Sequence, residues 1–134
     1  MRASDVMVSN PIVAVAGARA SEVAILFRDR NVSVVPVVDD HRTRRFLGTL
    51  SDRDIVTRCL APGLDPMHTR ADQLMRSSVA VGAGQELQGF ELRLDNEPNE
   101  SHLRPTITVV DDGNCVIGFI SHPEQVPGIS IAWG

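Results

Sequence analysis

The sequence is poor in aromatic residues: its 134 residues include one Trp, four Phe and no Tyr. A hydrophobic core must therefore be built from the aliphatic side chains of Val, Ile, Leu and Ala. The hydrophobic fraction of 43% and the charged fraction of 22% are ordinary for a globular protein. The length fits one ordinary domain, or two half-domains that are each too small to be stable alone.

Lysine is absent as well, so all 13 basic residues are arginines, and the net charge is −4. Because nucleic-acid backbones are bound by a basic face, this composition argues against a nucleic-acid partner.

No apolar run approaches the roughly 18–20 residues of a membrane-spanning helix, and the N-terminus lacks the apolar core of a signal peptide. The two cysteines do not make a disulfide framework. We expect no membrane contact and a cytoplasmic location.

An internal repeat organises the chain. The stretch VVPVVDD (34–40), followed by LGTLSDRDIV (47–56), recurs as TITVVDD (106–112), followed by IGFISHPEQV (117–126). Each copy joins two β-rich runs through a turn and ends in the polar start of a helix. Such repeats indicate supersecondary units that bury a core only by packing on each other.

In both copies the residue pattern predicts the order β-α-β-β-α. The predicted fold class is α/β (α+β), with two pseudo-symmetric halves packed sheet to sheet. We assign 1–62 to the first half, 63–70 to a linker and 71–134 to the second half. The first half is predicted to contain a helical turn at 4–7, a strand at 11–16, a helix at 20–30, strands at 33–38 and 46–50, and a helix from Ser51.

The second half repeats this order less faithfully. The pattern predicts a helical turn at 71–75, a strand at 79–81, a helix at 85–94 weakened by Gly89, an inserted loop at 95–104 and strands at 106–110 and 115–120. The last helix, begun at Ser121, meets Pro123 and then Pro127-Gly128, so little more than one turn is expected. The sequence leaves open whether the tail GISIAWG packs on its own subunit or on a neighbour.

These motifs resemble a tandem pair of CBS domains, often called a Bateman module. The first copy matches closely, with D-V-M then N-P at 5–11, V-V-P-V-V-D-D at 34–40 and G-T-L-S-D-R-D-I at 48–55. The second copy keeps A-D-Q-L-M at 71–75, T-V-V-D-D at 108–112 and G-F-I-S-H-P-E at 118–124. It departs in its inserted loop, its truncated last helix and Glu124, where the family usually has Asp.

The resemblance implies a non-enzymatic regulatory module that binds an adenosine derivative: AMP, ADP, ATP or S-adenosylmethionine. Transferred by position, Asp54 would accept hydrogen bonds from the ribose hydroxyls and Ser51 would face the phosphate. The adenine pocket would be lined by Pro11, Ile12, Val13, Ser33, Val34 and Pro36. The resemblance also implies a homodimer, and any output would pass through an effector protein that the sequence does not identify.

The pair Ser51 and Asp54 also has a purely structural interpretation. A helix start offers free N–H groups to an anion, but S-x-x-D before an apolar run is equally a capping box, in which the two residues satisfy each other's backbone. For a possible second site at Ser121 and Glu124 the cap interpretation is favoured, because Pro123 removes an N–H donor and the acid is longer.

Other polar residues carry weaker indications. Arg53 and Arg104 are candidates for phosphate contacts, although arginines are more often solvated surface residues. The four histidines lack metal-ligand spacing, so no metal site is expected. Cys59 lies on an apolar helical face and is expected in the core rather than as a nucleophile. We expect no catalytic activity and no tightly bound cofactor; the rival interpretation is a dimerisation or interaction module that binds no nucleotide.

Overall fold

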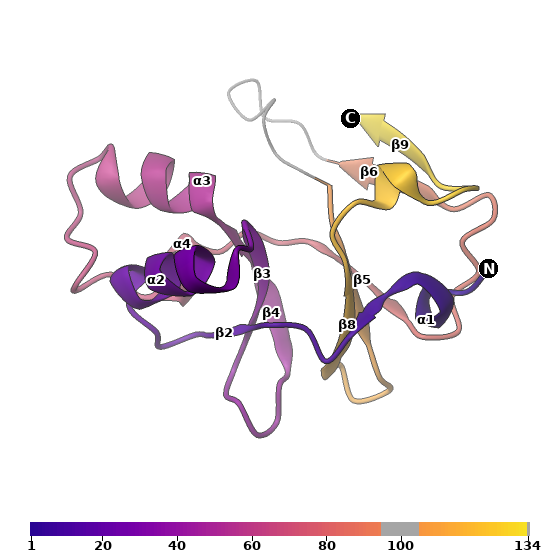
Figure 1. The fold of residues 1–134 in the computed structure, drawn as a ribbon, viewed down its shortest axis with the longest axis horizontal. Coiled ribbons are helices and arrows are strands. Elements are labelled where there is room, and N and C mark those ends of the chain that lie inside the picture. Colours follow the sequence, from indigo (N-terminus) through magenta and orange to yellow (C-terminus); the bar gives the residue numbers. More distant parts are fainter. Residues whose placement is uncertain (95–104, 134) are drawn as a thin grey trace.

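The structure, a computed structural model, describes residues 1–94 and 105–133 and shows two halves side by side (Figure 1). The predicted inserted loop at 95–104 lies outside the described residues. The sheet of the first half has the order β2-β3-β4. Its strands are β2 (Ala14–Val15), β3 (Val34–Val38) and β4 (Phe46–Ser51). The sheet of the second half has the order β1-β8-β7-β5. Its strands are β1 (Val8–Ser9), β5 (Val79–Gly82), β7 (Ile107–Val110) and β8 (Val116–Ile120).

The two halves repeat each other in strand pairing, which confirms the predicted architecture. In each half a parallel pair, β2 with β3 or β5 with β7, is followed by an antiparallel hairpin, β3 with β4 or β7 with β8. Both hairpins have an irregularity at the same place, between Val37 and Val38 and between Val109 and Val110. The β-branched runs seen in the sequence therefore form the inner strands of both sheets.

The longest helices of the described residues cover the sheet of the first half. Helix α2 (Ala20–Arg30) has the predicted bounds: Glu22 accepts from the backbone N–H of Arg19 at its start, and Asn31 ends it in the left-handed conformation (φ 53°). After β4, α3 (Asp52–Asp54) continues as a π-helix, η1 (Ile55–Leu60). Val23, Phe27, Ile55 and the fully buried Cys59 pack together in the core of this half, so Cys59 is a core residue as expected.

The predicted helix at 85–94 is wrong. Gly89 has a positive φ of 78°, which interrupts a helix, and its N–H donates to the carbonyl of Gly128. The chain then forms strand β6 (Glu91–Leu94), which pairs in parallel with β9 (Ser130–Trp133). The tail therefore packs on its own chain and covers this half in place of a helix. The last helix is one 3-10 turn, η2 (Pro123–Gln125), in line with the short helix predicted there.

The predicted strand at 11–16 is shortened to Ala14–Val15, and a separate short strand that was not predicted precedes it on the other sheet. Val8 and Ser9 form β1 on the edge of the second sheet, whereas Ala14 and Val15 form β2 in the first. Between them Asn10 adopts a positive φ of 48° before Pro11. This bend carries the chain from one half to the other.

Each half is completed by the opening segment of the other half. We use this term for residues 3–9, which open the first half, and residues 71–76, which open the second. Helix α1 (Ala3–Val6) lies on the second half, where the N–H groups of Ala3 and Ser4 donate to the carbonyls of Gln85 and Ala83. Helix α4 (Ala71–Leu74) lies on the first half, where Ala71 and Asp72 donate to Ala18 and Ala16. Buried side chains are exchanged in the same way: Ala71 and Leu74 belong to the core of the first half, and Ala3 belongs to the core of the second.

The residues that follow these two helices lie very close to a glycine of the neighbouring sheet. Arg76, just after α4, exchanges two backbone hydrogen bonds of 2.8 and 2.9 Å with Thr49, and a Cβ on Gly48 would lie 2.6 Å from the Arg76 carbonyl oxygen. In the other half, a Cβ on Gly118 would lie 2.1 Å from the sulfur of Met7. The glycine that precedes each S-x-x-acid motif is thus required by this close approach.

The two sheets also meet directly. Val13, Val38 and Val116 form a small core between them, with Val15 and Phe46 packed against it. The hairpin tips are joined by backbone hydrogen bonds from Phe46 to Asn114 and from Val116 to Arg44.

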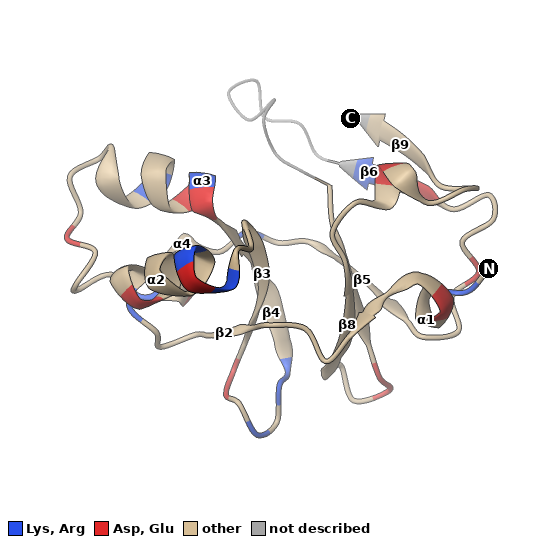
Figure 2. Cartoon of the chain, in the orientation of Figure 1, with Lys and Arg blue, Asp and Glu red and all other residues tan. Residues whose placement is uncertain are grey.

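Charged residues of both signs gather on helices and turns rather than on these inner strands (Figure 2). Within the described part of the chain, no helix is long and apolar enough to span a membrane.

The close approach at Gly48 predicts a specific loss of stability. Replacing Gly48 with Ala forces the Arg76 backbone away, and such overpacking costs about 1–3 kcal/mol. Urea unfolding of Gly48→Ala should show this decrease in the free energy of unfolding. The matched control is Gly17→Ala, whose new methyl group meets nothing within 4 Å. Equal stability of the two variants would contradict the exchange of opening segments.

Candidate functional site

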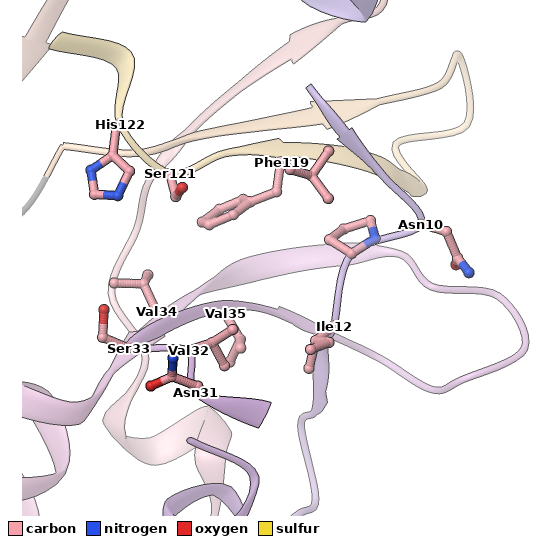
Figure 3. Close-up of a pocket in the computed structure, with 12 residues that line it drawn as sticks. Asn10, Ile12, Asn31, Val32, Ser33, Val34, Val35, Phe119, Ser121 and His122 are labelled. Carbon is pink, nitrogen blue, oxygen red and sulfur yellow. The ribbon is translucent and has the colours of Figure 1, made fainter. Parts of the chain in front are cut away.

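A pocket of about 320 Å³ opens between the two halves, which is near the lower end of the volumes typical of small-molecule sites. Its walls come from both sheets (Figure 3). The first half contributes chiefly Asn10, Pro11, Ile12, Asn31, Ser33 and Val34. The second half contributes Phe119, Ser121 and His122. A ligand in this pocket would touch both halves at once.

The backbone explains why polar groups reach this pocket. Asn10 and Asn31 both have positive φ values, 48° and 53°, because one forms the bend between the sheets and the other ends α2. The carbonyl oxygen of Ser33 accepts from the Asp52 N–H at 2.9 Å, which fixes the start of β3. Amide and hydroxyl groups thus border an otherwise apolar slot formed by Ile12, Val34 and Phe119. The arrangement suits a flat apolar ring with hydrogen-bonding groups at its edge.

Some of the residues predicted for the adenine pocket line this pocket, and others do not. Pro11, Ile12, Ser33 and Val34 are on its wall. Val13 is buried in the small core between the sheets, and Pro36 is buried within β3. Arg53 is exposed on α3, and Arg104 lies outside the described residues.

Ser51 and Asp54 form a capping box and are not among the described residues that line the pocket. The Asp54 N–H donates to the Ser51 hydroxyl oxygen at 3.1 Å, and the Ser51 N–H donates to Asp54 Oδ2 at 3.0 Å. The second carboxylate oxygen, Oδ1, accepts from Nε of Arg76 at 2.5 Å. Asp54 is only 3% exposed. Its charge is therefore held in a buried ion pair with the opening segment of the other half.

The pair Ser121 and Glu124 is arranged differently. The cap interpretation of this pair is wrong: His122, not Ser121, precedes η2, and no side chain caps the turn. Glu124 instead contacts His122, with 3.3 Å between Oε1 and Nδ1, and its side chain remains 45% exposed. Ser121 and His122 face the pocket, so the second copy of the motif supplies the wall opposite the first copy's Ser33 and Val34.

Sequence reasoning missed Asn10, Asn31, Phe119 and His122, and it assigned Ser51 and Asp54 to the same site as Pro11. The reason is the exchange of opening segments. Asn10, Pro11 and Ile12 follow the segment that lies on the second half, so they meet the end of β8 rather than the end of β4. One signal was present in the sequence: Asn before Pro at 10–11 and Asn after a helix at 31 are both typical of positive φ or a turn.

The described residues offer no group of three His, Cys, Asp or Glu side chains placed to hold a metal ion. Both cysteines are free thiols, Cys59 buried and Cys115 partly buried. The pocket's chemistry is therefore that of hydrogen bonding and apolar contact.

Comparisons with known proteins agree with this architecture. Residues 3–61 match the family model of the CBS domain, whereas a search of curated proteins finds no match. The chain is similar to Hypoxic Response Protein I, solved with two coordinated zinc ions, at 24% identity and a TM-score of 0.71 over 90% of this chain and 92% of that one.

Two further solved structures contain adenosine derivatives. A CBS domain protein from Pyrobaculum aerophilum complexed with AMP has 20% identity and a TM-score of 0.67, over 90% of this chain and 87% of that one. The CBS domain pair of protein MJ0100, in complex with 5′-methylthioadenosine and S-adenosyl-L-methionine, has 18% identity and a TM-score of 0.66, over 90% of this chain and 89% of that one. At these identities the likeness concerns the fold. Residues 3–61 match the CBS domain family model, and the chain as a whole has the fold of a tandem CBS-domain pair.

Proposed function

We propose that this chain is a non-catalytic regulatory module that binds an adenosine-containing ligand in the pocket between its two halves. The observation that carries the proposal is the composition of that pocket. An apolar slot is bordered by hydroxyl, amide and imidazole groups contributed by both halves. Structures of the same fold hold AMP, or 5′-methylthioadenosine and S-adenosyl-L-methionine, and the comparisons indicate no catalytic family.

The proposed ligand would be held by the parts of the pocket in distinct ways. Ile12, Val34 and Phe119 would pack against the adenine ring, which is flat and largely apolar. The side chains of Asn31, Ser33 and Ser121 would exchange hydrogen bonds with the polar edge of the base or with the ribose hydroxyls. Phosphate-bearing and sulfonium-bearing ligands, AMP, ADP, ATP and S-adenosylmethionine, are all within the proposed class.

Regulation would follow from the position of the pocket. A ligand that contacts Ser33 in one half and Ser121 in the other stabilises one relative placement of the two sheets. It shifts the population toward that placement by its difference in affinity between the two arrangements. The signal would then pass to an effector protein or to a second copy of the chain.

Filling the pocket should weaken binding without loss of the fold. For the wild type, ligand at 100 times its dissociation constant adds about 2.7 kcal/mol to the free energy of unfolding, which a thermal-shift panel of AMP, ADP, ATP and S-adenosylmethionine detects. In Ile12→Phe the larger ring occupies the slot, so we expect the affinity to fall at least about tenfold, or about 1.4 kcal/mol.

The control is Leu47→Phe, which introduces the same ring at a 40% exposed position on β4, away from the pocket and from the helices of the first half. This control should bind as the wild type does. A wild type that is unshifted by any of the four ligands at millimolar concentration would disprove the proposal. Equal binding by both Phe variants would show that the ligand lies elsewhere.

A homodimer is a second element of the proposal, and it rests on a separate observation. The helices of the first half expose large apolar side chains, among them Val56, Leu60 and Ile25, which are 52%, 51% and 49% exposed. Val56 and Leu60 are four residues apart on η1. Exposed apolar residues that gather on neighbouring elements indicate a contact surface, and a second copy of the chain is the occupant that we propose.

A charge on this helical surface should prevent association. In sedimentation-velocity experiments we expect the wild type to sediment as a dimer and Leu60→Glu as a monomer, because burying an unpaired carboxylate costs several kcal/mol. The control is Leu47→Glu at a 40% exposed position on β4. A monomeric wild type at micromolar concentration would refute the dimer and leave the proposed pocket unaffected.

A further inference from the structure

Val8 and Arg76 occupy equivalent positions in the two halves. Val8 pairs with Phe119 at the edge of β8, and Arg76 pairs with Thr49 on β4. Phe119 and Thr49 each follow the glycine that permits the close approach, and each precedes its S-x-x-acid motif by two residues. The backbone of the two segments is therefore alike, and the side chains differ.

That difference changes what lies next to each acidic residue. Val8 is on the wall of the pocket, next to the residues that the second half contributes. Arg76 instead extends to Asp54, and their side chains are 20% and 4% exposed. The carboxylate of Asp54 has one oxygen on the Arg76 guanidinium and the other on the Ser51 backbone N–H. Glu124, at the equivalent position, keeps a 45% exposed side chain.

We propose that Arg76 is an internal counter-ion that withdraws Asp54 from ligands, so that the chain takes up one ligand although it has two S-x-x-acid motifs. Ligand hydroxyls could reach Asp54 only by displacing the guanidinium. A buried, charge-assisted hydrogen bond between ions is stronger than one from a neutral hydroxyl, so the exchange is unfavourable. The identity of the ligand rests on the function proposed above, whereas the role of Arg76 rests on its contact with Asp54.

Exchanging the two side chains tests this directly. Isothermal titration calorimetry with AMP, and separately with S-adenosylmethionine, gives the number of ligands bound per chain. We expect about one for the wild type and about two for Arg76→Val, which places the side chain of Val8 beside Asp54. Val8→Arg places a guanidinium at the open pocket and should bind none. The double variant Val8→Arg with Arg76→Val should bind one, and adding Asp54→Ala should abolish that binding.

Several results would overturn the role of Arg76. These are a wild type that binds two ligands, an Arg76→Val variant that still binds one, or an absence of binding in both proteins. If only Arg76→Val binds, with one ligand per chain, the proposed pocket fails and the role of Arg76 is supported.

Removing Arg76 leaves Asp54 as an unpaired buried charge, so each variant is first checked for cooperative thermal unfolding. If Arg76→Val does not fold, Arg76→Val with Asp54→Asn removes both charges, and the amide oxygen can still accept from a ribose hydroxyl. We then expect about two ligands for this double variant. One ligand per chain would overturn the proposal.

Discussion

The structure depends on the exchange of opening segments between its two halves. A unit of about sixty residues buries too thin a core to be stable alone. Here each unit is closed by a short helix of the other unit and by the backbone pairing that follows it, strand β1 in one case and Arg76 alone in the other. Neither half could keep its core if the two were separated, because Ala71 and Leu74 would leave the first and Ala3 the second. The exchange therefore makes the pair of halves the smallest folding unit.

The same exchange decides which residues can act together. The chain leaves β1 and crosses to the first sheet through Asn10 and Pro11, so these residues face the end of β8. The pocket therefore combines the first half's strands with the second half's Ser121 and His122. It follows that a ligand at this place would report on the contact between the halves rather than on either half alone. This arrangement is what a regulatory module needs, since its output is a change in the relation of its parts.

The sequence predicted the elements well wherever local signals were consistent. Helix α2 and both hairpins follow from periodicity, β-branched runs and turn residues that agree with one another. The helix predicted at 85–94 failed because its apolar spacing was correct but Gly89 requires a backbone conformation that no helix contains. The strand pairing of β6 with β9 joins residues nearly forty positions apart, and no local pattern indicates such a contact.

The candidate site was predicted less well, for a related reason. Pro11, Ile12, Ser33 and Val34 line the pocket, and they belong to motifs that the CBS resemblance assigned to the adenine site. Their partners were assigned by position in the family motif, which gave Ser51 and Asp54, whereas the pocket of the structure has Ser121 and His122 beside them. The two alternatives differ only in which half packs against Pro11 and Ile12. That depends on the exchange of opening segments, a long-range contact that the local sequence does not indicate. The buried contact between Asp54 and Arg76 could not be seen either, since it joins the two copies of the repeat.

The exchange of opening segments allows the backbone of the two halves to be symmetric while the side chains near the two S-x-x-acid motifs differ. Val8 pairs with Phe119, and Arg76 with Thr49, through backbone groups. This pairing therefore does not depend on the side chains at positions 8 and 76. The glycines at 48 and 118 are fixed by the close approach, but the neighbouring side chain is free to be short and apolar or long and charged. A valine leaves space in front of the opposite sheet, whereas an arginine fills it and finds a carboxylate. The repeat can therefore keep its fold while a single residue changes the surroundings of one of its two S-x-x-acid motifs.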